Sequence, residues 1–125
     1  MYALPNAEKV LKDILQDELG VPVYVIPPKD AQGPYVRVSR VGGTVMNLVT
    51  DEPFMAVSGY SRDVFEASEL ANRAREVLLG CAGRFYGGVW VRRWRESAGP
   101  SNFPDPDSRL FRYQFSGVIS LATNN

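Results

Sequence analysis

The sequence predicts an α+β fold in which a mainly antiparallel sheet carries two helices packed on one face. Two amphipathic helical patterns are separated by short strand patterns, and most of the strands are joined by short turns. The expected element order is α-β-β-β-α-β-β. The chain has 125 residues, of which 45% are hydrophobic and 22% charged, so we expect residues 1–125 to form a single domain with its own core.

The first helix is expected to run from Ala7 to Leu19, with Asn6 as its N-cap. Gly20 and Pro22 end it, because glycine favours the helix C-terminus and proline cannot continue a helix. The apolar residues that recur at helical spacing, and that we expect to be buried, are Ala7, Val10, Leu11, Ile14, Leu15 and Leu19.

Two strands and an ambiguous segment follow this helix. Residues Val23–Ile26 predict a short strand, and Pro34–Arg40 predict a second strand that Gly42 and Gly43 break. The segment Thr44–Glu52 is apolar without a clean period. It is either a mobile arm or the edge of a hairpin packed on its own sheet.

The third strand, Pro53–Gly59, is predicted to turn through Gly59 and Ser61 into the central helix, residues 66–79. Asp63 is expected to cap this helix, although Ser61 is an alternative cap. The apolar stripe that should cover the sheet consists of Ala67, Leu70, Ala71, Ala74, Val77 and Leu78.

Beyond the central helix, Phe85–Gly88 predicts a turn, Val89–Arg95 a strand, and Gly99–Asp107 an extended, exposed loop with three prolines. Arg109–Leu121 is the longest strand pattern, with bulky apolar residues alternating with polar ones.

Strand alternation would place Trp90, Arg92 and Trp94 on one face. Such a face could stack nucleic-acid bases. The same residue types are also enriched at protein–protein contacts. In the third interpretation the tryptophans lie in the core under the helices, with Arg93 and Arg95 outside.

The net charge is zero, which argues against a surface that is a nucleic-acid footprint as a whole. The charge is unevenly distributed, however. Residues 84–112 hold six arginines against three acidic residues, so this segment carries +3 and the remainder −3. Arginine suits bidentate and stacked contacts at interfaces.

The residues of a catalytic or metal site are missing from the sequence. There is no histidine, and Cys81 is the only cysteine, so Ser-His and Cys-His nucleophiles and typical zinc sites are excluded. No glycine pattern matches a nucleotide-binding motif. We therefore expect no catalytic residue, no metal and no cofactor, and we expect Cys81 to be a buried small apolar residue.

The order of helices, strands and glycine positions resembles a known family. The pattern comprises an amphipathic N-terminal helix, the strand Pro-Tyr-Val-Arg-Val-Ser-Arg-Val-Gly-Gly starting at Pro34, a semi-apolar segment, and the strand Pro53–Gly59 leading into Phe-Glu-Ala-Ser-Glu-Leu-Ala-Asn-Arg-Ala-Arg-Glu-Val-Leu. Over about Pro5 to Leu121 it resembles the small tail terminator, or tail completion, proteins of long-tailed non-contractile bacteriophages.

The resemblance implies a structural virion protein and not an enzyme. Such a protein forms a hexameric ring that caps the tail tube, ends its polymerisation and joins it to the head-completion ring, while DNA only passes through the lumen. The implied partners are further copies of this chain, the tail tube protein and a head-completion protein. The implied location is the head-proximal end of the virion tail, and the host cytoplasm during assembly.

We expect no membrane partner, because no apolar stretch approaches the length of about 18 residues that spans a bilayer. The residues that we expect at a subunit or partner interface are Val45, Met46, Leu48, Val49, Arg92, Arg93, Arg95 and Phe103. Two alternatives remain open, namely another head–tail joining or minor tail component, and a nucleic-acid-binding module that uses the Trp/Arg strand.

Overall fold

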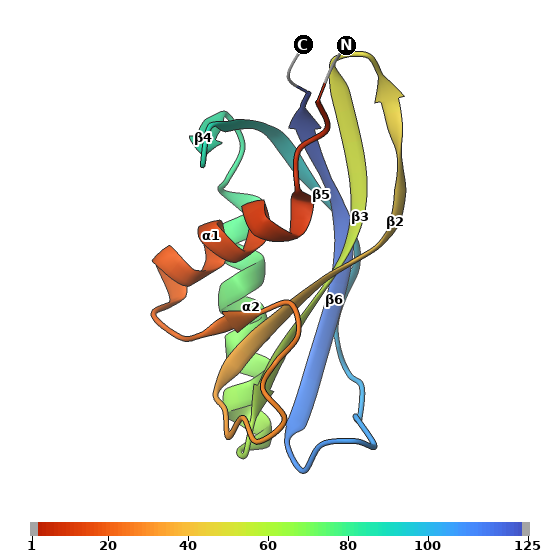
Figure 1. Ribbon diagram of the computed structural model, residues 1–125. Coiled ribbons are helices and arrows are strands. Elements are labelled where there is room, and N and C mark those ends of the chain that lie inside the picture. Colours follow the sequence, from red (N-terminus) through yellow and green to blue (C-terminus); the bar gives the residue numbers. More distant parts are fainter. Residues whose placement is uncertain (1–2, 124–125) are drawn as a thin grey trace.

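The computed structural model describes residues 3–123 as one six-stranded sheet with two helices on the same face (Figure 1). The strand order is β1-β2-β3-β6-β5-β4, and every neighbouring pair is antiparallel except β1 and β2. In chain order the elements are α1 (Ala7–Leu19), β1 (Val23–Tyr24), β2 (Tyr35–Asn47), β3 (Thr50–Ser61), α2 (Val64–Leu79), β4 (Arg84–Tyr86), β5 (Val89–Asn102) and β6 (Phe111–Ala122). The predicted fold class and order are confirmed, with β4 as an additional short strand.

Both helices have the predicted N-caps and C-terminal ends, and α2 starts at Val64, two residues before the predicted start at Glu66. The Asn6 side chain accepts a hydrogen bond from the Lys9 amide of α1. The Asp63 carboxylate accepts hydrogen bonds from the Phe65 and Glu66 amides of α2, at 2.8 and 3.1 Å. Asp63, and not Ser61, is therefore the N-cap of α2.

The core lies between the helix layer and one face of the sheet. Both predicted apolar stripes face it, and only Val77 among them is half-buried. The α2 helix lies across β3, β6 and β5, while α1 lies against β1, β2 and α2. The fully buried side chains that the sheet contributes include Val36, Val38, Met55, Val57, Val91, Phe115, Ile119 and Leu121.

The predicted turn at Gly59 is wrong. Gly59 continues β3 opposite Val36 and Tyr113, and the strand ends only at Ser61. A β-carbon at this position would lie 2.8 Å from the Ala67 carbonyl oxygen of α2. Glycine is therefore needed here because the helix backbone packs directly on the strand.

The predicted break at Gly42 and Gly43 is also wrong, because β2 runs through both glycines to Asn47. The strand accommodates them with a bulge between Arg40 and Gly42. Gly43 has φ +91°, and a β-carbon there would lie 2.2 Å from the Glu52 carbonyl oxygen of β3. The segment Thr44–Glu52 is thus the end of the β2–β3 hairpin, which was one of its two interpretations.

Three further boundaries differ from prediction. β1 stops at Tyr24 and does not reach Ile26. Residues 85–86 belong to β4, and only Gly87 and Gly88, both with positive φ, form the turn into β5. β5 continues to Asn102, which pairs with Tyr113, so the first residues of the predicted loop are strand.

Candidate functional site

The far end of the β2–β3 hairpin, residues 41–49, is exposed throughout and rich in hydrophobic side chains. Its apolar members are Val41, Val45, Met46, Leu48 and Val49, of which Met46 and Leu48 are 60% and 66% exposed. Figure 1 shows this hairpin extending past the helix layer. Contiguous exposed apolar surface of this kind marks interaction sites. We call residues 41–49 the hairpin tip.

Hydrogen bonds tie the hairpin tip to two other segments. The Val49 carbonyl accepts from the Thr123 amide at 3.0 Å and from Arg92 Nη2 at 3.3 Å. The Thr123 hydroxyl donates to the Leu48 carbonyl at 2.5 Å, and the Val49 amide donates to the Asn47 side chain. The tip is therefore fixed against β5 and the end of β6.

Charged side chains lie beside the tip on the face of the sheet that the helices leave open. The Glu52 carboxylate accepts a 2.5 Å hydrogen bond from the Ser120 hydroxyl and lies 3.6 Å from Arg93 Nη2. Met46, Arg92 and these three residues line a small open cavity of about 300 Å³. The sheet thus brings two of the predicted arginines and the predicted apolar residues together.

Asp51 lies under the hairpin tip and is completely buried. Its Oδ2 is 3.4 Å from Arg40 Nη1, whereas its Oδ1 has no hydrogen-bond partner among the residues that the structure describes. A buried carboxylate depends on such a partner because burial removes its hydration. The Arg40–Asp51 pair therefore ties this part of β2 to β3.

Two exposed apolar residues at the same end of the molecule were not predicted as site residues. Leu4 is 53% exposed, and Phe85 of β4 is 67% exposed. The Phe85 ring packs edge-on against Trp90 at 4.8 Å, and a cavity of about 510 Å³ separates this pair from the segment at Leu4. The sequence signal for Phe85 was hidden because the residue was assigned to a turn.

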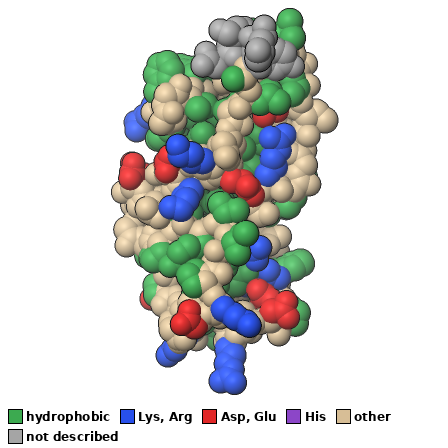
Figure 2. All heavy atoms as spheres, viewed as in Figure 1, with side chains coloured by type: hydrophobic (Ala, Val, Ile, Leu, Met, Phe, Trp, Pro, Cys, Tyr) green, Lys and Arg blue, Asp and Glu red, His purple; other side chains and the backbone are tan. Residues whose placement is uncertain are grey.

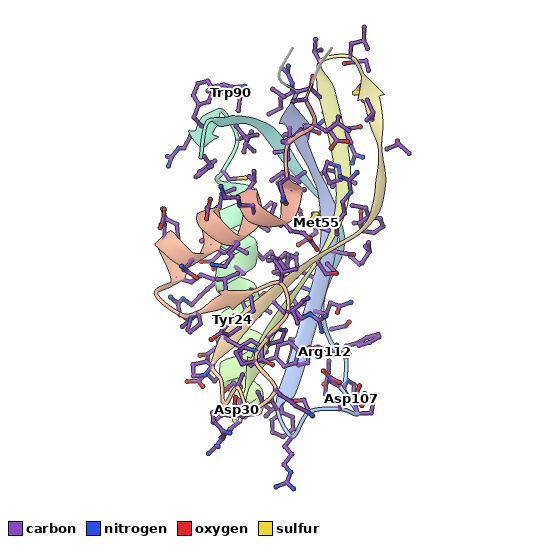
Figure 3. All side chains as sticks on the ribbon, in the orientation of Figure 1. Tyr24, Asp30, Met55, Trp90, Asp107 and Arg112 are labelled. Atoms are coloured by element: carbon purple, nitrogen blue, oxygen red, sulfur yellow. The ribbon has the colours of Figure 1, made fainter. Side chains whose placement is uncertain are left out.

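The remaining two candidates lie apart from the tip. Arg95 is exposed on β5. Phe103 packs under the Arg112 guanidinium at 4.7 Å, and Arg112 also donates to the Phe103 carbonyl and to the Tyr60 hydroxyl. Arg112 and Trp90 lie toward opposite ends of the molecule (Figure 3). The eight predicted interface residues are thus all exposed, but they do not form one patch.

The predicted common face of Trp90, Arg92 and Trp94 does not exist. A bulge between Val91 and Arg93 shifts the alternation, so that Val91 and Trp94 face the core. Trp94 is only 8% exposed and contacts Phe115 edge-on. These two tryptophans therefore cannot form a base-stacking platform. Figure 2 shows acidic and basic side chains interspersed over the visible face, which is not the continuous basic surface that binds nucleic acid.

Two buried groups, Cys81 and Tyr35, have raised pKa values. Cys81 is 1% exposed, which confirms its predicted burial, and this burial raises the pKa of its thiol to about 11. Burial, and then the neighbouring Tyr60 and Asp105, raise the pKa of Tyr35 to about 12. Both shifts keep the group protonated at neutral pH, which does not activate a thiol as a nucleophile.

The described residues, 3–123, contain neither a candidate metal centre nor a candidate membrane-spanning helix. Within this range, no three histidine, cysteine, aspartate or glutamate side chains cluster as metal ligands would. Neither helix in the described range has the length and hydrophobicity needed to cross a membrane.

Comparison with known proteins identifies the family to which the chain belongs. A search of curated proteins found no match. A family model described as "Phage tail termination protein" matches residues 3–116, from the segment before α1 into β6, and so includes the whole β2–β3 hairpin. The chain therefore belongs to the phage tail termination protein family, whose members are structural components of bacteriophage tails.

Proposed function

We propose that this protein acts as a tail terminator by forming a closed hexameric ring on the head-proximal end of the tail tube. The ring ends tube polymerisation and joins the tube to the head-completion protein, and DNA only passes through its lumen. Assembly takes place in the host cytoplasm. We also propose that residues 1–125 act as one domain, since a single continuous sheet runs through the described chain.

The observation that carries this proposal is the exposed hairpin tip. A lone subunit leaves the apolar side chains of residues 41–49 in water although hydrogen bonds fix their position. Burying a side chain such as leucine contributes about 1.5–3 kcal/mol, so association that covers the tip is favourable. We place the tip and the adjacent Arg92 and Arg93 at contacts between subunits or with the tube.

The exposed position of Arg95 and Phe103 supports a second contact region on the same subunit. A ring requires two different surfaces on each subunit, one that docks on each neighbour. The charge division, +3 in residues 84–112 and −3 elsewhere, suits such a head-to-tail contact.

The test measures molar mass by light scattering over a concentration series and images the largest species by negative stain. We expect rings of the native protein, and loss of rings when Met46→Ser and Leu48→Ser are combined. Phe65→Ser is the matched control, because Phe65 is also highly exposed but lies on α2.

Two losses of about 1.5–3 kcal/mol each predict a weakening of assembly of at least a hundredfold. At concentrations where every protein is monomeric, all variants should unfold at the same temperature as the native protein, because the three side chains are exposed. A native protein that stays monomeric at every concentration, or that forms only a two-fold dimer, contradicts the proposal.

A further inference from the structure

We infer that neighbouring copies of this chain join by pairing the free edge of β2 with the free edge of β5, so that the sheet continues from subunit to subunit. The inference rests on the ring proposed above, and it specifies how that ring is held together.

Both edges of the sheet are only partly covered. β1 pairs with Val36 and Arg37 alone, so β2 from Val38 to Asn47 has a strand partner on one side only. β4 pairs with β5 no further than Val91, so β5 from Arg92 to Asn102 is likewise open on its outer side. These statements concern residues 3–123. Unpaired strand edges recruit further strands unless they are protected.

The strand directions suit a side-by-side repeat. Each step from β2 to β3, β6 and β5 is antiparallel, so β2 and β5 run in opposite directions at the two edges. A second copy set beside the first in the same orientation therefore brings its β2 antiparallel to β5. Repetition of one such contact generates a ring if the rotation closes.

The free segments also lie at the same level across the sheet. Ser39 pairs with Ala56, Ala56 with Ser116, and Ser116 with Ala98. In the same way, a row of paired residues leads from Arg40 on β2 to Glu96 on β5. Neighbours can thus pair these edges without sliding along the strands, as a flat ring requires.

The charges at this level are complementary. Arg40 and Glu96 occupy the ends of one row, and both side chains lie on the helix-covered face, where Arg40 reaches Asp51 and Glu96 binds Arg75 of α2. In the paired arrangement, Arg40 of one copy faces Glu96 of the next. Opposite charges across a strand pair favour that register.

In the single subunit, the backbone amide of Arg40 binds a side chain in place of a neighbouring strand. This amide points out of the open edge and donates a 3.0 Å hydrogen bond to the Glu8 carboxylate of α1. A strand carbonyl from the next copy can replace this acceptor. Glu8 thus satisfies the edge of the free subunit at the place where the neighbour would dock.

The test combines Ser39→Cys and Ala98→Cys in a Cys81→Ala background and oxidises the assembled protein. Within one copy these two positions are three strand spacings apart, about 14 Å, whereas a disulfide needs Cα atoms within about 7 Å. Only a bond between copies can form. In a parallel experiment, a short bismaleimide crosslinks the two cysteines even if the register between the copies is shifted by one residue.

We expect a ladder of covalent oligomers on a denaturing gel, ending at the mass that light scattering gives for the ring. An equal mixture of the two single variants should stop at dimers, and each single variant alone should stay monomeric. The control pair Ser39→Cys with Asn72→Cys, on the exposed side of α2, should also stay monomeric.

Rings without a ladder, or covalent dimers from Ser39→Cys alone, would overturn the edge pairing and leave the proposed ring intact. Absence of any oligomer at high concentration would overturn the ring and the edge pairing together.

Discussion

Replacement of Gly117 by alanine adds one carbon atom to the core and so tests how tightly the sheet is packed at this position. Gly117 is buried in β6 on the face that the helices cover, and the Trp94 ring from β5 lies directly over it. An added β-carbon would lie 2.5 Å from Trp94 Cζ2 and 2.7 Å from the Arg95 carbonyl oxygen. Both distances are shorter than a van der Waals contact, and the Arg95 carbonyl oxygen belongs to the backbone. Either the indole or the β5 strand must therefore move.

The expected cost follows from these contacts. Overpacking a core costs about 1–3 kcal/mol, and the reduced freedom of the unfolded chain returns about 0.4–1 kcal/mol. We expect a net loss of about 1.3 kcal/mol in the free energy of unfolding. For a chain of this length that lowers Tm by about 5 °C. Urea unfolding, followed by tryptophan fluorescence in a Trp90→Phe background, reports on Trp94 directly.

Gly99→Ala is the matched control, because Gly99 is also in the sheet but its nearest neighbour, Arg75 Nη2, would be 3.6 Å from the new β-carbon. Its Tm should not fall. A double-mutant cycle with Trp94→Leu should show positive coupling, because the smaller side chain relieves the clash. If Gly117→Ala unfolds at the native urea midpoint, the proposed stacking of Trp94 on Gly117 is refuted.

Three further predictions concern the helices and the buried thiol. Gly59→Ala should cost about 1–3 kcal/mol of the free energy of unfolding, because the new β-carbon meets the Ala67 carbonyl at 2.8 Å; an unchanged urea midpoint would contradict this packing. Asn6→Ala should cost about 1 kcal/mol through loss of the cap on the Lys9 amide, with Asn6→Ser as the conservative control in the same thermal melt. The Cys81 thiol should resist a thiol reagent at pH 8 until denaturant is added, because it is 1% exposed and its pKa is raised to about 11. The folded pKa of Cys81 lies above the unfolded value of about 8.5, so the neutral thiol stabilises the fold fully below pH 8.5, and this stabilisation is lost as the pH rises to about 11. The Tm of the native protein should therefore fall more steeply between these pH values than the Tm of Cys81→Ala.

The helices could be predicted from the sequence because their signals are local. The apolar residues of α1 and α2 recur at helical spacing, and the caps Asn6 and Asp63 stand directly before the first turns. The fold class followed from the short connections between strands. The residues proposed for the hairpin tip are all exposed, while their role at an interface stays a prediction.

The errors concern contacts between different helices and strands of the fold. Gly59 resembles a turn residue until α2 is placed on it, and Gly43 resembles a strand break until β3 passes within contact of its backbone. The bulge between Val91 and Arg93 arises from pairing with β6, so strand alternation alone could not separate Trp90 from Trp94. A glycine or a bulge in a strand is determined by the neighbouring strand or helix, which periodicity does not reveal.

The open edges of the sheet also bear on the choice between a ring and a dimer. Two β2 edges can pair antiparallel about a two-fold axis, which would close the assembly at two copies and leave β5 from Arg92 to Asn102 open on each. Such a dimer would also place Arg40 away from Glu96, because both β5 strands would be on the outside. Pairing β2 with β5 instead uses the open segments of both strands in every copy, and only a closed ring leaves neither segment unpaired. The same sheet that forms the core of the subunit thus favours a head-to-tail assembly, and the edge left over in a dimer is the physical reason.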